Sequence, residues 1–229
     1  MKTKLITALS AAGVSLAAVN VNAQELTWTA SAGVESEYVF RGVEIASESF
    51  QASIEGAYGD GYFGVWMNES LEDEDKGASE YDFYAGYGYA INDTLTADFG
   101  ATLYHYPDAD DETFEIYTGL SLDAPLAPSF YVYYDFDLEA LTLEGSVSKS
   151  YDVAEKTALE LGAAAGWVDS DLDEGAEFYY YNATADLVYS FNETTTASIG
   201  ARVGGNDGRF GEGGKDDNAW AGVSFSKSF

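Results

Sequence analysis

Pairs of carboxylates two positions apart are the residues in this chain that could do chemistry. Glu35 with Glu37 and Asp135 with Asp137 are such pairs, and residues i and i+2 of a β-strand point to the same side. Two adjacent acids could act as general acid and base. The chain has forty acidic residues, so such pairs also arise by chance. We therefore expect no catalytic residues and no enzyme activity.

Other reactive groups are scarce. The single histidine, His105, lies between Tyr104 and Tyr106, and its parity predicts a position facing lipid, with no nucleophile to serve. The chain has no cysteine, which excludes disulfides, thiolate metal sites and cysteine nucleophiles. Acidic runs at 72–75, 108–112 and 169–174 could bind divalent cations weakly, but they lack the spacing of an EF-hand loop. We expect no cofactor and no built metal site.

A period of two runs through the chain and predicts strands. Between Leu26 and Phe40 the even positions are mostly apolar and the odd ones mostly polar or small. The pattern recurs at 50–58, 81–91, 95–105, 114–122, 130–138, 141–151, 159–167, 179–191, 197–203 and 219–229, and less cleanly at 62–68, where both faces are apolar. Twelve strands predict an all-β fold, a transmembrane antiparallel up-and-down β-barrel.

The links between these strands alternate in length. Short links at 59–61, 92–93, 123–128, 152–156 and 192–193 alternate with longer, acidic ones near 41–48, 69–79, 107–112, 169–177 and 205–217. Glu139-Ala140 is the exception, because a tight link stands where a longer one is expected. Outer-membrane barrels have short periplasmic turns and longer outer loops, and an even strand number predicts that both termini are periplasmic.

Charge separates the two faces of the strands. The apolar parity carries only Lys149 and Lys227, whereas the other parity carries many acids, as expected for a wet interior. Aromatic residues flank an aliphatic middle in two strands, with Tyr38 and Phe40 ending the first, which indicates two membrane interfaces. A soluble sandwich has less reason for this grading. The predicted pore-lining residues are Glu35, Glu37, Arg41, Glu55, Asp82, Asp98, Glu115, Glu144, Asp186 and Arg202.

The N-terminus predicts export. Lys2 and Lys4 precede an apolar run, and small residues end at Ala23, so we expect residues 1–23 to be a signal peptide. An uncleaved anchor helix is the alternative, although the run is short for a span. Residues 24–229 then form one domain. The net charge of −30 becomes −32 when the two lysines leave, which disfavours nucleic acid as a partner.

Several segments resemble one family. SEYVFRG from Ser36 to Gly42, YFGVWMNES from Tyr62 and LEGSVSKSY from Leu143 are similar to the TorF-like porin family, also called Gcw_chp, with Arg41-Gly42 the most specific part. The resemblance covers most of the chain after residue 23 and implies an outer-membrane barrel with a proposed porin role. Lys227 departs from the apolar residue often found there, which would weaken recognition by the assembly machinery.

These features lead to two hypotheses about function. The first is a porin in the cell outer membrane, with a narrow acidic lumen that passes small cationic or neutral solutes. The alternative is a non-conducting structural barrel whose acidic loops bind divalent cations or lipopolysaccharide. Arg41 would pair with inward acids such as Glu35 or Glu55 and set the local field of a constriction, or it would only satisfy a buried acid cluster or snorkel towards the surface. Lipid, lipopolysaccharide and, through a last strand ending in Phe229, the barrel assembly machinery are the expected partners.

Overall fold

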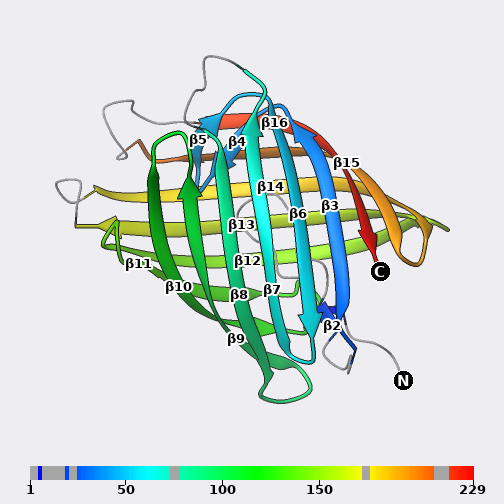
Figure 1. Cartoon of the computed structure of the whole chain (residues 1–229). Coiled ribbons are helices and arrows are strands. Elements are labelled where there is room, and N and C mark those ends of the chain that lie inside the picture. Colours follow the sequence, from blue (N-terminus) through cyan, green and yellow to red (C-terminus); the bar gives the residue numbers. More distant parts are fainter. Residues whose placement is uncertain (1–4, 7–18, 21–24, 73–77, 172–175, 209–216) are drawn as a thin grey trace.

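A computed structural model shows a closed antiparallel β-barrel (Figure 1). It describes residues 5–6, 19–20, 25–72, 78–171, 176–208 and 217–229. The twelve predicted strands are confirmed, and β16 pairs with β3 to close the ring. The barrel strands are β3 (Thr27–Glu35), β6 (Ser49–Tyr58), β7 (Gly61–Ser70), β8 (Glu80–Ala90), β9 (Leu95–Tyr106), β10 (Asp111–Leu122), β11 (Ser129–Asp135), β12 (Ala140–Ala154), β13 (Thr157–Ser170), β14 (Ala176–Asn192), β15 (Thr195–Asn206) and β16 (Asp217–Ser228).

The barrel has its apolar side chains outside and its charged ones inside. On β6, Phe50 and Ile54 are 37% and 48% exposed, whereas Gln51 and Glu55 are 7% and 6% exposed. Alternation along a pleated strand explains the split, because successive side chains point to opposite faces. The arrangement reverses that of a soluble protein. No helix in the described part of the chain is long and apolar enough to cross a bilayer.

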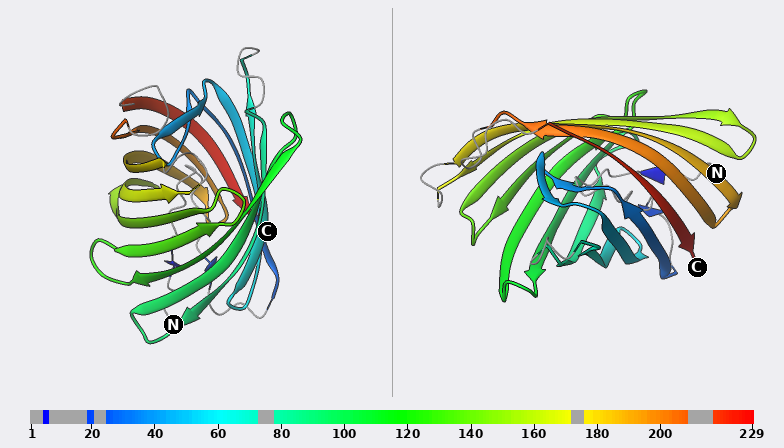
Figure 2. Two further views of the ribbon diagram at one scale, coloured as in Figure 1. Left: turned by 90° about the vertical axis from the view of Figure 1, so that its left-hand side faces the viewer. Right: turned by 90° about the horizontal axis from the view of Figure 1, so that it is seen from above.

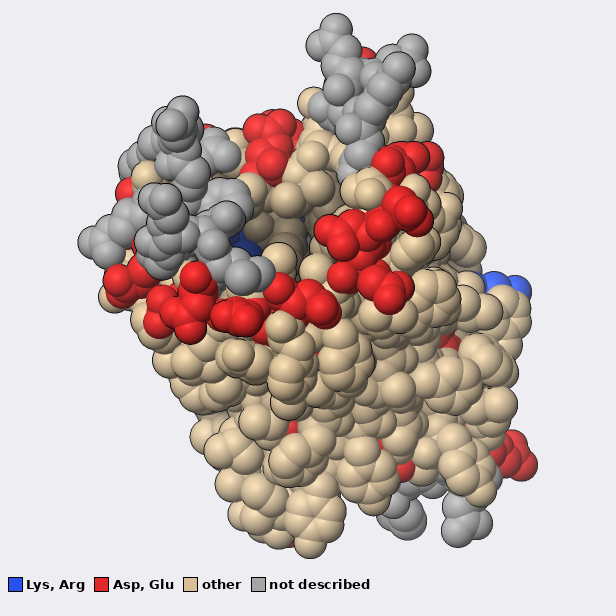
Figure 3. Space-filling view, turned by 60° about the vertical axis from the view of Figure 1, so that its left-hand side comes forward, with Lys and Arg blue, Asp and Glu red and all other residues tan. Residues whose placement is uncertain are grey.

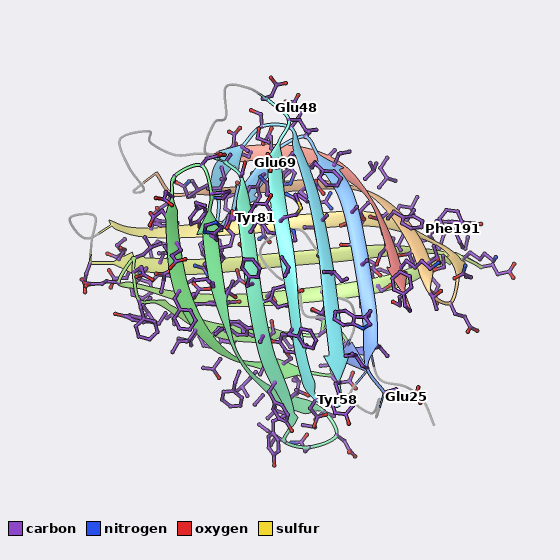
Figure 4. The ribbon with its side chains drawn as sticks, viewed as in Figure 1. Glu25, Glu48, Tyr58, Glu69, Tyr81 and Phe191 are labelled. Atoms are coloured by element: carbon purple, nitrogen blue, oxygen red, sulfur yellow. The ribbon has the colours of Figure 1, made fainter. Side chains whose placement is uncertain are left out.

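The two ends of the barrel differ. Short links at 59–60, 91–94, 123–128, 155–156 and 193–194 lie at one end, which we call the turn end, where Phe229 N–H also donates to Trp28 O across 2.8 Å. The opposite end is the loop end. Figure 4 shows Glu48 and Glu69 at the loop end and Tyr58 at the turn end. Two loop-end links, 107–110 and 136–139, are tight. The first was expected to be longer.

The prediction for the first strand is wrong at its C-terminal end. We expected one strand from Leu26 to Phe40, but β3 ends at Glu35. Tyr38–Phe40 form a separate strand, β4, which pairs with β5 (Val43–Ala46). Tyr38 is 2% exposed and therefore belongs to no lipid-facing aromatic belt. A period of two cannot distinguish a wall strand from a hairpin strand that continues the alternation after a bend.

Most of the expected signal peptide falls outside the described residues. Only two short pieces of residues 1–23 are described, β1 (Leu5–Ile6) and β2 (Val19–Asn20), which pair with each other. Cleavage after Ala23 stays a prediction.

Candidate functional site in the barrel interior

The link between β3 and β6 folds back as a hairpin inside the loop end (Figure 2). Its strands β4 and β5 turn at Arg41 and Gly42, which have φ of 47° and 76°. Only glycine adopts such values without strain, so Arg41 is held there by its surroundings. Tyr38, Val39 and Ala46 are each less than 10% exposed. The hairpin is therefore packed into the barrel interior.

Arg41 binds the far wall of the barrel. Its guanidinium contacts both carboxylate oxygens of Glu115 on β10, with Nη2 3.0 Å from Oε1 and Nη1 2.8 Å from Oε2. The Tyr104 hydroxyl donates to the same Oε1 at 2.9 Å. The guanidinium carbon lies 4.8 Å from the ring centroids of both Phe40 and Tyr133. Planar guanidinium groups suit such bidentate and stacked sites.

The guanidinium of Arg41 stays protonated although it is buried. Arg41 belongs to the link between β3 and β6 and not to a barrel strand. Burial is the largest single effect and lowers the pKa of the guanidinium, but the Glu115 carboxylate, together with Tyr104 and Tyr180, raises the pKa above its ordinary value. The hairpin tip therefore always carries a positive charge.

Further contacts attach the hairpin to other strands. The Tyr38 hydroxyl donates to Glu80 on β8 at 2.9 Å, and the Tyr38 ring packs on Trp66 of β7. At the tip, Asn206 Nδ2 of β15 donates to Gly42 O at 2.8 Å. The hairpin thus spans the loop end from β7 and β8 to β15. We call the position of the hairpin among these contacts its seat. The seat also explains why both faces of residues 62–68 are apolar, since Trp66 faces the hairpin.

A second ion-pair cluster lies on the other side of the interior. Arg202 Nη2 on β15 lies 3.0 Å from Asp186 Oδ1 and 3.3 Å from Glu35 Oε1. Arg41 therefore pairs with an inward acid, as expected, but with Glu115 and not with Glu35 or Glu55. Glu35 is taken by Arg202, and the Glu55 carboxylate accepts from the Tyr84 hydroxyl at 3.1 Å. Arg41 reaches across the barrel because the hairpin carries it away from its own strand.

Inward tyrosines line the barrel, most of them on β7–β11, with Tyr180 on β14. Each of five inward tyrosines stands directly opposite a glycine of the neighbouring strand, and its ring occupies the space that a glycine Cβ would take. The pairs are Tyr62–Gly86, Tyr84–Gly64, Tyr117–Gly100, Tyr131–Gly119 and Tyr180–Gly166. The rings therefore lie along the wall.

Near the turn end these tyrosines surround one carboxylate. The Tyr62 hydroxyl lies 3.1 and 3.0 Å from the two oxygens of Asp98, and the Tyr131 hydroxyl donates to Asp98 Oδ2 at 3.2 Å. The hydroxyls of Tyr62 and Tyr117 are 2.7 Å apart. The Tyr131 and Tyr133 rings stack with centroids 5.8 Å apart. One aromatic wall on β7–β11 thus continues from Asp98 to the seat of Arg41.

The wall opposite is lined by small hydroxyl residues towards the turn end. Ser198 and Ser224 share a hydrogen bond of 2.8 Å, as do Thr29 and Ser228 at 3.0 Å. Ser148, Ser198 and Ser224 are half-buried, whereas Glu80, Glu115 and Asn206 near the loop end are fully buried. The interior is therefore most tightly packed around the hairpin and more accessible towards the turn end.

The structure places nine of the ten predicted pore-lining residues in three groups, and the tenth, Glu37, lies in the bend between β3 and β4. Arg41 is brought to Glu115, with Glu144 nearby through the Tyr180 hydroxyl, which donates to it at 2.7 Å. Arg202 joins Glu35 and Asp186. Inward-facing positions that contact neither arginine are held by Glu55, Asp82 and Asp98. A role in lining a pore stays a prediction for all of them.

Both carboxylate pairs singled out in the sequence are separated. Glu37 lies beyond the end of β3, in the bend before the hairpin, so the two acids are not on one strand. β11 ends at Asp135, whose Oδ1 accepts the backbone N–H groups of Asp137 and Leu138 and so caps a turn. Asp137 itself is exposed. Strand ends, which the alternation did not reveal, break both pairs.

The loop end carries an acidic rim. Figure 3 shows Asp and Glu side chains gathered around the mouth at this end, whereas the side of the barrel seen there is almost free of charge. Parts of the acidic runs, residues 73–75 and 172–174, lie outside the described residues. In the described part of the chain, no group of three or more His, Asp or Glu side chains is placed to hold a metal ion.

Sequence reasoning missed the aromatic half of the interior. The missed residues each contact an acid or the hairpin, and all except Tyr38 have inward parity: Tyr38, Tyr62, Trp66, Tyr84, Tyr104, Tyr117, Tyr131, Tyr133, Tyr180 and Asn206. Tyrosines on the same parity as carboxylates were the available signal. Their pairing with glycines depends on strand register, which the sequence alone does not give.

Comparison with protein-family models shows which family the chain belongs to. The family described as "Bacterial protein of unknown function (Gcw_chp)" matches residues 20–225. The chain belongs to the Gcw_chp family. The match covers all twelve barrel strands except the last residues of β16. A search of curated proteins gives no match to this Gcw_chp protein.

Solved structures share the architecture of this Gcw_chp barrel. The KdgM porin is 13% identical, with 88% of this chain and 99% of that chain covered and a TM-score of 0.61. The NanC porin is 12% identical, with 88% and 98% covered and a TM-score of 0.56. The COG4313 outer membrane channel from Pseudomonas putida F1 is 10% identical, with 97% of each chain covered and a TM-score of 0.56. At these identities the similarity concerns the fold.

Proposed function

We propose that this Gcw_chp protein is an outer-membrane porin through which small cationic or neutral solutes diffuse passively. The charge of the barrel interior carries the proposal. Among the described inward-facing residues, ten carboxylates outnumber two arginines, Arg41 and Arg202. The acids are Glu35, Glu55, Glu80, Asp82, Asp98, Glu115, Asp135, Glu144, Glu160 and Asp186.

An interior of this sign selects among solutes. Carboxylates along a narrow path lower the energy of a cation and raise that of an anion. The KdgM porin has been solved in complex with oligogalacturonate, which is a polyanion. The acidic interior of this chain would repel such a solute. The proposal therefore takes the channel architecture from the fold and the preference for cations from this chain's own side chains.

The surroundings of the barrel are part of the proposal. Exposed aliphatic side chains such as Ile54 and Ile199, 48% and 59% exposed, would face acyl chains in the outer membrane. The acidic rim would face outwards and bind divalent cations or lipopolysaccharide. The turn end, which holds the start of β3 and the end of β16, would then be periplasmic. The last strand, ending in Phe229, would engage the assembly machinery. We also propose that the chain belongs to the TorF-like porins within the Gcw_chp family.

One observation favours the alternative, a non-conducting structural barrel. The β4–β5 hairpin crosses the loop end and is attached to β7, β8, β10 and β15. A hairpin that never leaves this seat could leave no continuous path for solutes. The same transport measurements distinguish the two functions.

Swelling of proteoliposomes tests the proposal. Liposomes with the folded protein are diluted into isosmotic solutions of a small sugar, an amine hydrochloride or the sodium salt of an acid of matched size. We expect fast swelling with the sugar, and faster uptake of the amine cation than of the acid anion. Swelling no faster than in protein-free liposomes would contradict a porin, and preference for the anion would contradict the charge argument.

A further inference from the structure

The Arg41 seat shows what the aromatic wall binds. A guanidinium group there is held by a carboxylate, a tyrosine hydroxyl and two ring faces. Each component favours a planar cation: the carboxylate through bidentate hydrogen bonds and the rings through cation–π attraction. The ligand in this case is the chain's own side chain, delivered by the hairpin.

The same components recur one step along the wall. Tyr133, which lies under Arg41, stacks on Tyr131, two residues nearer the turn end and about 7 Å along the strand. The Tyr131 hydroxyl donates to Asp98, as the Tyr104 hydroxyl donates to Glu115. Asp98 therefore repeats the carboxylate with its hydroxyl donor and neighbouring ring. No Lys or Arg of the described residues lies within 4 Å of it.

Hydrogen-bond capacity remains at Asp98. A carboxylate has about four acceptor positions. The hydroxyls of Tyr62 and Tyr131 have one proton each, and the backbone N–H of Phe99 also donates to Asp98, so these groups fill at most three of them. Glu115 uses its capacity on the two guanidinium nitrogens of Arg41 and on Tyr104. At least one position of Asp98 is open to a donor from the interior.

A solute in the barrel interior can also reach Asp98. Asp98, Tyr117 and Tyr131 are half-buried, whereas Glu115 is 1% exposed beneath Arg41. Hydroxyl residues on the opposite wall, including Ser198 and Ser224, also line the interior towards the turn end.

We propose that Asp98, Tyr131 and Tyr117 form a binding site for solutes that carry a guanidinium group, a vacant counterpart of the Arg41 seat. The proposal rests on the proposed function, because the solute must enter the interior. It names the solutes: small molecules with a planar cation that can lie on the Tyr131 ring and donate to Asp98. A neutral group of the same shape would lack the charge that both components recognise.

Calorimetric titration of the detergent-folded full chain tests this site without requiring transport. The probes are butylguanidinium and butylurea, which match in shape and differ in charge. We expect butylguanidinium to bind at least about tenfold more tightly, as one charge-assisted hydrogen bond implies. Asp98→Asn should remove most of that difference, and Tyr131→Ala should weaken binding. Asp152→Asn on β12 and Tyr134→Ala on β11, both at exposed positions, should leave binding unchanged.

Several results would overturn the site. Equal binding of the two probes to the wild type would do so, and this comparison needs no variant to fold. Binding to folded Asp98→Asn as tight as to the wild type would also do so. Heat-modifiable migration confirms folding of each variant. Selective binding without liposome swelling would contradict the porin and keep the site, whereas swelling without selectivity would contradict the site alone.

Discussion

Arg41 and Glu115, 74 residues apart in the sequence, form a two-point ion pair inside the loop end of the barrel, with N–O distances of 2.8 and 3.0 Å. The pair joins the tip of the β4–β5 hairpin to the wall at β10. Both side chains are buried, with 14% and 2% of their surface exposed. The ion pair therefore holds in place the element that narrows the interior.

Replacing Arg41 should loosen the hairpin. Arg41→Ala leaves Glu115 as a buried carboxylate without its cation, which typically costs about 3 to 5 kcal/mol. We expect lower resistance to urea unfolding and a larger single-channel conductance in planar bilayers. Arg41→Lys keeps the charge without the two-point geometry and should lie between the two proteins. Unchanged conductance and stability in folded Arg41→Ala would show that the hairpin is held by other contacts.

The hairpin tip offers a second way to displace it. Gly42 has φ 76°, and a Cβ there would overlap the backbone of Gly205 and lie 2.8 Å from Tyr180 Cβ. We expect Gly42→Ala to push the tip from its seat, so that trypsin cleaves after Arg41. Gly59→Ala is the matched control, because Gly59 has a similar φ of 59° but no atom near its added Cβ. The wild type and the control should resist cleavage at Arg41, and equal cleavage of all three would refute the seat.

A charge on the outer face should be costly. Ile199 on β15 is 59% exposed on the apolar exterior, and an arginine at mid-bilayer costs about 2 to 4 kcal/mol. We expect Ile199→Arg to lower the free energy of unfolding in liposomes by that order. The neighbouring Ser198→Arg would point inwards among carboxylates and should cost much less. Equal costs would mean that the exterior of the barrel does not face lipid.

The tyrosine–glycine pairs should resist change at the glycine. A Cβ on Gly100 would overlap the Tyr117 ring, whereas one on Gly145 would meet only Ser129 O at 3.9 Å. Overpacking typically costs about 1 to 3 kcal/mol. We expect Gly100→Ala to lower the urea midpoint and Gly145→Ala to leave it near that of the wild type. If Tyr117→Ala restores the midpoint of Gly100→Ala, the ring is the cause.

The strands could be predicted from the sequence because each depends on local alternation. β14 is an example: Tyr179, Leu187 and Phe191 share a parity and are all exposed. The hairpin could not be separated in this way, because Tyr38 and Phe40 continue the alternation of β3. Only the bend at Ser36 and Glu37 and the tertiary seat distinguish them.

The site could be predicted in composition but not in pairing. Parity identified the inward acids, since charge is excluded from a lipid face. The partners of Arg41 and Glu35 depend on which strands face each other across a closed barrel, and a single sequence does not specify this. For the same reason, Tyr131 and Gly119 could not be paired before the register of β10 with β11 was known.

The reversal potential of single channels in a KCl gradient tests the acidic pore most directly. We predict discrete conductance steps whose reversal potential shows preference for K⁺ over Cl⁻. Glu55→Gln and Asp98→Asn should reduce that preference, and Glu155→Gln, in the exposed turn between β12 and β13, should not. Absence of steps from folded protein, or preference for Cl⁻, would contradict a cation-selective porin.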